Sequence, residues 1–230
     1  MIILGLQKLT LLDFPGKMAC TVFTGGCNFR CPFCHNASLV IPSKMGAAMS
    51  TDEFFAFLEK RRGILQGVCV SGGEPTLMFD LEDFLAKIKS MGYAVKLDTN
   101  GSRPEVLRSV VEKGLVDYVA MDIKNSPDMY VRTVGVEKFD VAPILESAEY
   151  LMSGAVDFEF RTTLVGGLHT EREMHLIGEW LRGAPRMYLQ NFVDSGDLIS
   201  SGLVGVDKNT TVALCNLLKS YIPNAEIRGL

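Results

Sequence analysis

The sequence predicts an α/β protein, an open and incomplete (β/α)6 barrel of the TIM type. Six short apolar segments alternate with segments of helical periodicity, which indicates parallel strands joined by right-handed helical crossovers. A complete barrel of eight units typically needs about 250 residues. This chain has 230 residues, and roughly the first fifty form mainly an N-terminal segment and a cysteine-containing loop. We therefore expect six βα units within one domain that spans residues 1–230.

The expected elements follow one another in a regular order. Residues 1–17 form an N-terminal segment that ends in the turn composition Asp13-Phe14-Pro15-Gly16 and leads into the first strand. The six strands are expected at 18–24, 67–70, 93–97, 116–121, 156–164 and 186–190, with a short final strand at 225–228. The helices are expected at about 51–62, 80–91, 104–113, 139–152, 170–182 and 208–220. Residues 18–190 thus form the six units, and residues 191–230 a C-terminal helix and short strand.

Several helices carry recognisable start signals. Ser50 followed three residues later by Glu53 is a capping box at the start of the first helix. Asp80 is expected to cap the second helix, and Pro143 lies in the first turn of the fourth. These signals support the helix boundaries independently of the apolar pattern.

Composition and charge argue against several classes of protein. The net charge of −4 and the isoelectric point near 5.5 show no bulk basic surface, which argues against nucleic acid or an anionic membrane as the main partner. No run approaches eighteen apolar residues, and the N-terminus lacks a signal-peptide pattern, so we expect a cytoplasmic protein. In a reducing compartment disulfides are not expected, and Cys20, Cys69 and Cys215 lie in apolar stretches as core residues would.

The loop after the first strand concentrates the remaining thiols. Cys27, Cys31 and Cys34 fall within eight residues, on a segment too short and too interrupted by proline to be a regular helix. A disulfide would leave one thiol unused, and a closed structural zinc site needs four ligands. Thiolates suit iron-sulfur clusters, and three of them would leave one iron of a four-iron cluster open to a ligand. A zinc site made of these thiolates and His35 is the alternative.

Polar or glycine-rich residues follow other strands in the same register. Ser71-Gly72-Gly73-Glu74-Pro75 follows the second strand, Asp98-Thr99 the third and Asp122 the fourth, and Arg161 lies in the fifth. The carboxyl ends of barrel strands share one rim, where barrel enzymes build their sites. We therefore expect these residues around one cavity that also contains the three thiols.

The three histidines have different expected positions. His35 directly follows the last cysteine and is expected near the metal centre. His169 and His175 lie around a helix start and are expected at the surface or in a helix cap.

These motifs together resemble a known family. Cys-x-x-x-Cys-x-aromatic-Cys after the first strand, with Gly-Gly-Glu-Pro after the second, is similar to the radical S-adenosylmethionine (SAM) superfamily. The longer string 23–36, with Gly5-Leu-Gln-Lys and 13–16 ahead of it, resembles the glycyl-radical-enzyme activating proteins. Within them, it is most similar to the anaerobic ribonucleoside-triphosphate reductase activating proteins.

The resemblance implies cofactors and a role for each motif. A 4Fe-4S cluster would be ligated by Cys27, Cys31 and Cys34, and its fourth iron would bind the amino and carboxylate groups of SAM. Phe33 would lie against the adenine. The other residues implied to bind SAM are Gly72, Gly73, Glu74, Asp98, Thr99, Asp122 and Arg161, with Gly72, Gly73 and Glu74 receiving the methionyl amino group. A monovalent cation is implied at Asp98, Thr99, Met121 and Asp122, and contacts with a partner loop at Asp13 and Phe14.

The resemblance also implies a reaction and partners. One electron from the reduced cluster would cleave SAM, and the 5'-deoxyadenosyl radical would take hydrogen from a glycine of a glycyl radical enzyme, with the anaerobic ribonucleoside-triphosphate reductase expected. The electron donor would be of the flavodoxin or ferredoxin type. Two departures concern the partner: Gln190-Asn191 stands where some relatives have His, and Phe14 where the formate-lyase activating relatives have Gly. A radical SAM enzyme acting on a small molecule is the alternative.

Overall fold

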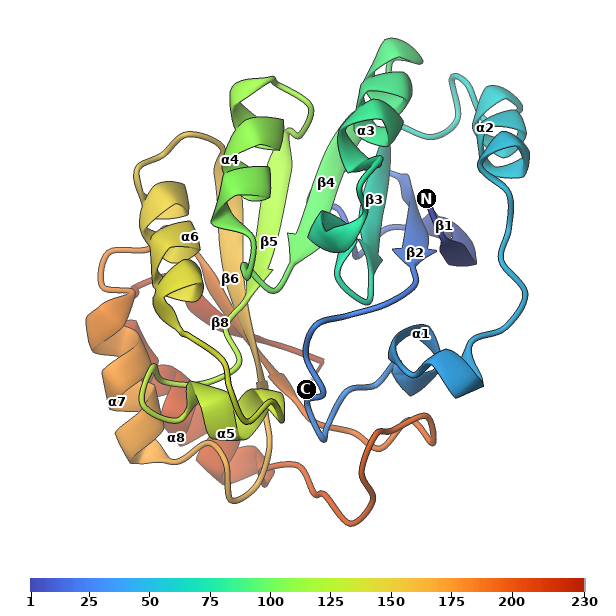
Figure 1. Cartoon of the computed structure of the whole chain (residues 1–230). Helices are drawn as coiled ribbons and strands as arrows, with labels where there is room; N and C mark the ends of the chain where they lie inside the picture. Colours follow the sequence, from blue (N-terminus) through green and yellow to red (C-terminus); the bar gives the residue numbers. More distant parts are fainter. Residues whose placement is uncertain (230) are drawn as a thin grey trace.

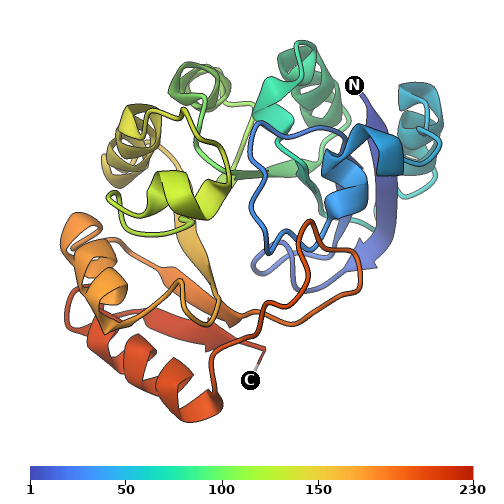
Figure 2. The same cartoon turned by 60° about the horizontal axis from the view of Figure 1, so that its bottom comes forward.

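The computed structural model describes residues 1–229, and its strands form one eight-stranded sheet that curves with helices on its outside (Figures 1 and 2). The strands lie in the sheet in the order of the sequence. They are β1 (Ile3–Thr10), β2 (Ala19–Thr24), β3 (Gly67–Gly72), β4 (Ala94–Thr99), β5 (Tyr118–Asp122), β6 (Asp157–Leu164), β7 (Met187–Asn191) and β8 (Ala225–Arg228). Each neighbouring pair from β2 to β8 is parallel. The expected six strands and the short final strand are therefore confirmed.

The first strand was missed by the sequence analysis. Residues 1–17 were expected only to lead into the barrel, but Ile3–Thr10 forms β1, antiparallel to β2. Its register with β2 is irregular, with shifts between Ile3 and Gly5 and between Gln7 and Thr10. A short edge strand with a glycine and polar residues gives a weak alternating pattern, which explains why it was overlooked.

The barrel is open between its two edge strands. In the described part of the chain, β1 and β8 each pair with one neighbour and not with each other. Seven parallel strands with helical crossovers cannot close a barrel that typically requires eight, so the expected open and incomplete barrel is confirmed.

The expected helices are present, and the structure adds short ones. They are α1 (Ala37–Val40), α2 (Thr51–Glu59), α3 (Leu81–Ser90), α4 (Pro104–Glu112), α5 (Tyr130–Val134), α6 (Ala142–Met152), α7 (Glu171–Trp180) and α8 (Lys208–Lys219). The sequence analysis missed α1 and α5, which have four and five residues and therefore too few turns to show a helical period. Two short 3-10 turns occur at Pro42–Lys44 and Pro75–Leu77.

One helix start differs from expectation. The capping box of Ser50 and Glu53 is present as predicted. Asp80 lies at the N-cap position of α3, but its side chain makes no capping hydrogen bond. Its carboxylate instead binds the amino group of Met1. The expected side-chain cap was wrong because a full positive charge competes better for this carboxylate than backbone amides do.

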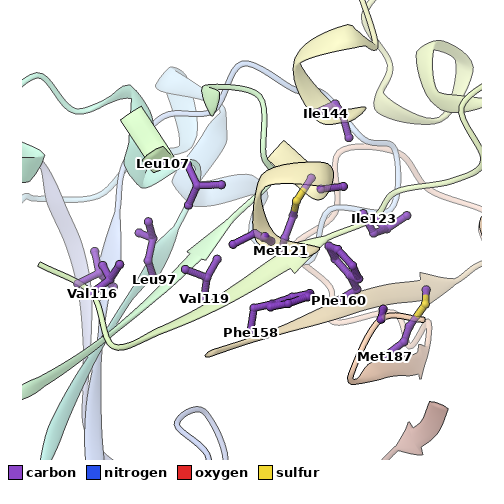
Figure 3. Close-up of a cluster of buried hydrophobic side chains, with 14 of the residues drawn as sticks. Leu97, Leu107, Val116, Val119, Met121, Ile123, Ile144, Phe158, Phe160 and Met187 are labelled. Atoms are coloured by element: carbon purple, nitrogen blue, oxygen red, sulfur yellow. The ribbon is translucent and has the colours of Figure 1, made fainter. Parts of the chain in front are cut away.

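The outer face of the sheet packs against the helices (Figure 3). Leu97 and Met121, from β4 and β5, lie there with Leu107 of α4 and Ile144 of α6, all fully buried. Cys20, Cys69 and Cys215 are also buried, as expected of core residues. Successive side chains of a strand point to opposite faces, so the neighbours of these apolar residues along β4 and β5 point into the barrel. That interior is where the polar residues gather.

In the described residues, no helix is both long enough and apolar enough to cross a membrane.

Candidate active site

A cavity of about 270 Å³ lies at the carboxyl ends of the strands. All residues predicted to bind the cluster or SAM line it: Cys27, Cys31, Phe33, Cys34, Gly72, Gly73, Glu74, Asp98, Thr99, Asp122 and Arg161. Met121, Asp13 and Phe14 do not line it. Figure 2 looks onto this end of the barrel, where the blue segment after β2 carries the cysteines. The prediction that one rim brings these motifs together is confirmed.

The cysteine loop is held by backbone contacts at its centre. The Arg30 guanidinium donates from Nη1 to the carbonyls of Cys27, at 2.6 Å, and Phe29, at 2.7 Å. The amide of Arg30 donates to the carbonyl of Val134 at 2.8 Å, which ties the loop to α5. The amide of Phe29 donates to Cys27 Sγ at 3.3 Å. The loop is therefore shaped by its own side chain and by a neighbouring helix.

Burial controls the protonation of the thiols. It raises the pKa of Cys27 to about 11 and that of Cys31 to about 12, although the nearby Lys124 ammonium lowers both. Without a metal these thiols stay protonated at neutral pH, whereas coordination to a metal removes the proton. The loop therefore suits a bound cationic centre better than a free thiolate nucleophile.

The zinc alternative finds no geometric support. Among residues 1–229, no group of three or more His, Cys, Asp or Glu side chains converges closely enough to hold a single metal ion. His35 lines the same cavity as the thiols, but its ring stacks near Phe192, with centroids 5.2 Å apart. A cluster of several irons spans a larger distance between its thiolate ligands than one ion does, and the donor set fits it.

The two glycines after β3 allow close packing of two backbone segments. A Cβ on Gly73 would lie 1.9 Å from the carbonyl oxygen of Gly26, and Gly72 has a φ of +125° that other residues rarely adopt. The amide of Gly73 donates to Thr24 at 2.9 Å, and that of Glu74 to Gly26 at 2.8 Å. The glycines therefore join the Gly-Gly-Glu segment to the start of the cysteine loop.

Glu74 joins the ends of β3 and β4. Its carboxylate is fully buried and accepts from the Thr99 hydroxyl at 2.8 Å, from the Asn100 amide at 2.6 Å, and from the amide and hydroxyl of Thr76. Burial raises the pKa of Glu74, and these hydrogen bonds oppose that rise. Glu74 therefore holds two rim segments in place, whatever else it contacts.

A row of alternating charges crosses the inner face of β4, β5 and β6. Asp98 binds the Lys96 ammonium and accepts from Arg161 Nη1 at 3.2 Å, and Asp122 accepts from Arg161 Nε at 2.9 Å and from Lys124 Nζ at 3.1 Å. Burial alone would raise the pKa of both carboxylates. The attraction of Arg161 and of the lysines outweighs this effect, so the pKa of Asp98 and that of Asp122 are both lowered. The carboxylates are therefore ionised, and the row is a fixed electrostatic surface.

The Met121 side chain, implied as a ligand of a monovalent cation, does not reach the cavity. It follows Ala120 and precedes Asp122 in β5, so its side chain points to the opposite face of the strand from that of Asp122. It is fully buried beneath the helices, beside Ile144 (Figure 3). Strand alternation alone would have excluded its side chain.

Asp13 and Phe14 lie before β2, at the other end of the barrel from the cavity. Phe14 is buried, and its ring packs 6.3 Å from that of Tyr118, the first residue of β5. Asp13 accepts a hydrogen bond from the Thr21 hydroxyl. This placement does not support their expected contact with a partner loop.

The sequence analysis missed several residues around the cavity. Asn100, which lines it, donates from Nδ2 to Asn28 at 3.0 Å and approaches Cys27 Sγ at 3.8 Å. Lys124 also lines the cavity. Lys96 does not line it but forms an ion pair with Asp98, which does. Their positions one or two residues from predicted rim residues were the available signal, since side chains at i and i+2 of a strand share a face.

His169 was expected at the surface or in a helix cap, and it is in neither place, because it is buried and Thr170 caps α7. It is 3% exposed, its Nδ1 accepts from the amide of Val165 at 3.1 Å, and its Nε2 lies 2.9 Å from the carbonyl of Lys124. Burial lowers the pKa of His169, so the ring is neutral. Its Nε2 carries the proton and donates a hydrogen bond to the backbone carbonyl of Lys124. His169 thus fixes the loop after β5. His175 is exposed, as expected, and bonds the Tyr221 hydroxyl.

The segment after β7 crosses to the cysteine loop (Figure 2). The Asp197 carboxylate accepts from the amide of Ser38 at 3.0 Å and from its hydroxyl at 2.6 Å. The amide of Ser200 donates to the carbonyl of Pro32 at 3.0 Å. Residues 192–206 therefore lie against the loop and against α1, on the side where the barrel is open.

The donor chemistry of the cavity fits the expected cofactors. Three thiols from one loop suit an iron-sulfur cluster and leave its fourth iron without a protein ligand. The adjacent rim offers backbone polar groups, an aromatic ring at Phe33, and charges of both signs, as a ligand with amino, carboxylate and aromatic parts requires.

Comparisons with known proteins agree with this arrangement. The profile of the Radical SAM superfamily matches residues 21–181. A protein of Methanocaldococcus jannaschii named as a glycyl-radical enzyme activating enzyme is 31% identical over 232 residues, covering 98% of this chain and 95% of that protein. A protein of Thermococcus kodakarensis named as a GTP 3',8-cyclase is 29% identical over 147 residues, covering 64% of this chain and 47% of that one. The structure of a radical SAM methyltransferase from Sphaerobacter thermophilus has a TM-score of 0.73 at 16% identity, covering 96% of this chain and 68% of that chain.

The matched family segment includes the carboxyl ends of β2, β3, β4, β5 and β6, and therefore the cavity-lining residues that follow these strands. It includes the three thiols, the Gly-Gly-Glu segment and the row of charges. The structural neighbour confirms the fold alone, whereas the family match covers well over half of the chain. The chain belongs to the radical SAM superfamily.

Proposed function

We propose that this protein is a radical SAM activase that generates a glycyl radical on a partner enzyme. The observation that carries the proposal is the convergence of the three thiols, the Gly-Gly-Glu segment and the charged rim on one cavity. The choice of an activase is supported by the similarity to the activating enzyme of Methanocaldococcus jannaschii, which extends over nearly the whole of both chains.

The cofactors supply the difficult chemistry, and the chain supplies orientation. A bound cluster would supply one electron, taken from an external donor, for the cleavage of SAM into methionine and a 5'-deoxyadenosyl radical, which would take one hydrogen atom from the substrate. Cys27, Cys31 and Cys34 would hold the cluster. Gly72 to Glu74 would receive the amino group of SAM, and Phe33 would lie against its adenine.

Other residues tune and shield this centre. Asn100 directs an N–H group at Cys27 Sγ, and hydrogen bonds to sulfur raise the reduction potential of a cluster. Lys124 places a positive charge near the thiolates. Residues 192–206 lie beside the cysteine loop and α1, where they would limit the access of water from that side.

The partner in this proposal is a glycyl radical enzyme, and specifically the anaerobic ribonucleoside-triphosphate reductase. The support is the resemblance of residues 23–36 and 13–16 to the activating proteins of that reductase. A glycine-bearing loop would enter where β1 and β8 leave the barrel open, and it would have to displace or pass residues 192–206. The electron donor is a small flavodoxin or ferredoxin.

A second candidate is an enzyme that acts on a small molecule, favoured by the similarity to a GTP 3',8-cyclase. That match covers under half of the other protein, so a large part of the relative has no counterpart in the matched region. For this reason we place the activase first.

The test is a label-transfer experiment under anaerobic conditions. Reconstituted protein, SAM, a reductant and the intact reductase, with deuterated glycine in its radical loop, should yield deuterated 5'-deoxyadenosine and a glycyl radical signal by electron paramagnetic resonance. Cys31→Ala should abolish both, and the core variant Cys20→Ala serves as the matched control. If no label is transferred while GTP or another purine nucleotide is consumed, the activase proposal fails.

A further inference from the structure

Each oxygen of the two rim carboxylates is already paired with a cationic side chain of the chain. Asp98 Oδ1 accepts from the Lys96 ammonium, and Asp98 Oδ2 from Arg161 at 3.2 Å and from the Ser71 hydroxyl at 3.1 Å. Asp122 Oδ1 accepts from Arg161 at 2.9 Å, and Asp122 Oδ2 from Lys124 at 3.1 Å. Every carboxylate oxygen thus already has a cationic donor of the chain itself.

We infer that this chain supplies its own counter-cations beside SAM, with Lys96 and Arg161 in the role that the family resemblance gives to a monovalent metal ion. The inference rests on the proposed SAM site. It makes Lys96, which does not itself line the cavity but pairs with Asp98 in the cavity wall, a positioning residue for the row of charges.

The remaining candidate ligands of a metal ion are also unavailable. Alkali-metal ions, like other hard cations, bind through oxygen atoms. The Thr99 hydroxyl donates to Glu74 at 2.8 Å and accepts from the Gly101 amide at 3.1 Å. Met121 offers a thioether that lies in the core on the other face of β5. Of the residues implied for the cation, Asp98, Thr99 and Asp122 line the cavity but already have partners within the chain, and the Met121 side chain lies outside it.

The local charge also opposes a further cation. Within the row alone, and without Glu74 and the thiols of the same cavity, three cationic side chains face two carboxylates, which leaves one positive charge in excess in the row. The Lys96 side chain is 1% exposed and that of Asp98 is 13% exposed, so water screens their charges poorly. A metal ion would add a second excess charge, whereas the carboxylate of a ligand would neutralise the first. The row is therefore suited to an anionic group of the cofactor without an intervening metal.

The first arm of the test uses the wild-type protein. The affinity of the anaerobically reconstituted protein for SAM is measured by equilibrium dialysis at one ionic strength in potassium, sodium and tetramethylammonium chloride. We expect the same affinity within error in all three salts, and no bound thallium ion by thallium nuclear magnetic resonance. Weakening by roughly tenfold or more in tetramethylammonium, or a bound thallium signal, would overturn the inference.

The second arm uses Lys96→Met, which frees an oxygen of Asp98 and keeps the length of the side chain. SAM should bind this variant roughly tenfold more weakly in tetramethylammonium and recover in potassium, because the metal ion replaces the lost ammonium. Lys89→Met is the matched control, since Lys89 binds Asp117 away from the cavity. Lys96→Arg should behave as wild type, and if Lys96→Met does not fold, the wild-type arm decides.

The outcomes separate the two claims. If Lys96→Met binds SAM as the wild type does in every salt, Lys96 is not a counter-cation and the inference fails while the SAM site stands. If the wild-type protein binds no SAM in any salt, the proposed function itself fails, and the inference with it.

Discussion

Two charged residues on the same face of β6 show that a buried charge can either stabilise the fold or form part of a cavity wall. Glu159 and Arg161 are two positions apart, so both side chains point into the barrel. Glu159 is fully buried and accepts from Arg228 at 2.8 and 2.9 Å and from the Tyr118 hydroxyl at 2.9 Å. Arg161 binds two carboxylates and also lines the cavity.

The difference lies in what each cluster faces. Glu159 joins β5, β6 and β8, and none of its partners lines the cavity. Its cluster is complete within the chain and acts as a structural tie at one end of the barrel. The Arg161 cluster is also paired within the chain, but it faces open space beside the thiols. Buried charge alone therefore does not identify a site, whereas buried charge at the wall of a cavity does.

The largest expected effect on stability is at Glu159. Glu159→Ala leaves the Arg228 guanidinium and the Tyr118 hydroxyl without their partner, and we expect a loss of about 3 kcal/mol in the free energy of unfolding. Urea unfolding measures this loss, and the affinity for SAM should stay unchanged. A variant that is as stable as the wild type but binds SAM poorly would break the comparison.

Arg161→Met should show the reverse behaviour. Asp98 and Asp122 keep Lys96 and Lys124 as partners, so stability should fall less than in Glu159→Ala. The affinity for SAM should fall by about one to two decades, which corresponds to a lost charged hydrogen bond of about 1.5–3 kcal/mol. The same dialysis experiment on both variants gives the answer. If Glu159→Ala and Arg161→Met lower stability and SAM affinity equally, Glu159 and Arg161 belong to one cluster and not to two.

Asn100→Ala should change the cluster without removing it. The lost hydrogen bond to Cys27 Sγ stabilised the more negative, reduced cluster, so the reduction potential should fall by about 40 mV for a bond worth about 1 kcal/mol. Redox titration followed by electron paramagnetic resonance measures the potential. Ser102→Ala is the control, because Ser102 contacts Asn28 and no sulfur. A higher potential in Asn100→Ala would contradict the assignment.

His169 predicts a modest dependence of stability on pH. Its folded pKa lies below the unfolded value of 6.5, so its contribution is fully present above that value and is lost as the pH falls through it. The free energy of unfolding should decrease between about pH 7.5 and about pH 5.5, and less so in His169→Phe. His175→Phe, at an exposed position, should retain the decrease of the wild type. If the free energy of unfolding falls as much in His169→Phe as in the wild type, another group causes the pH dependence.

The sequence predicted the cavity better than its surroundings. The thiols and the Gly-Gly-Glu segment were found because each follows a strand directly, and parallel strands bring such residues to one rim. β1 was missed because an edge strand with glycine has little alternation, and His169 because a loop conformation, not a pattern, buries it. Met121 was implied by the family resemblance alone, and the alternation of side chains along β5 turns its side chain away from the cavity. Lys96 was overlooked although its partner, Asp98, lies two positions along the same strand and on the same face.

The most direct test of the account is the electron paramagnetic resonance spectrum of the reduced protein with and without SAM. The account predicts the signal of a reduced four-iron cluster that changes on addition of SAM, because the fourth iron is open beside the rim. The triple Cys→Ala variant at residues 27, 31 and 34 should lose the signal, and the triple variant at residues 20, 69 and 215 should retain it. A full cluster signal in the first variant, or a wild-type signal that SAM does not alter, would contradict the account.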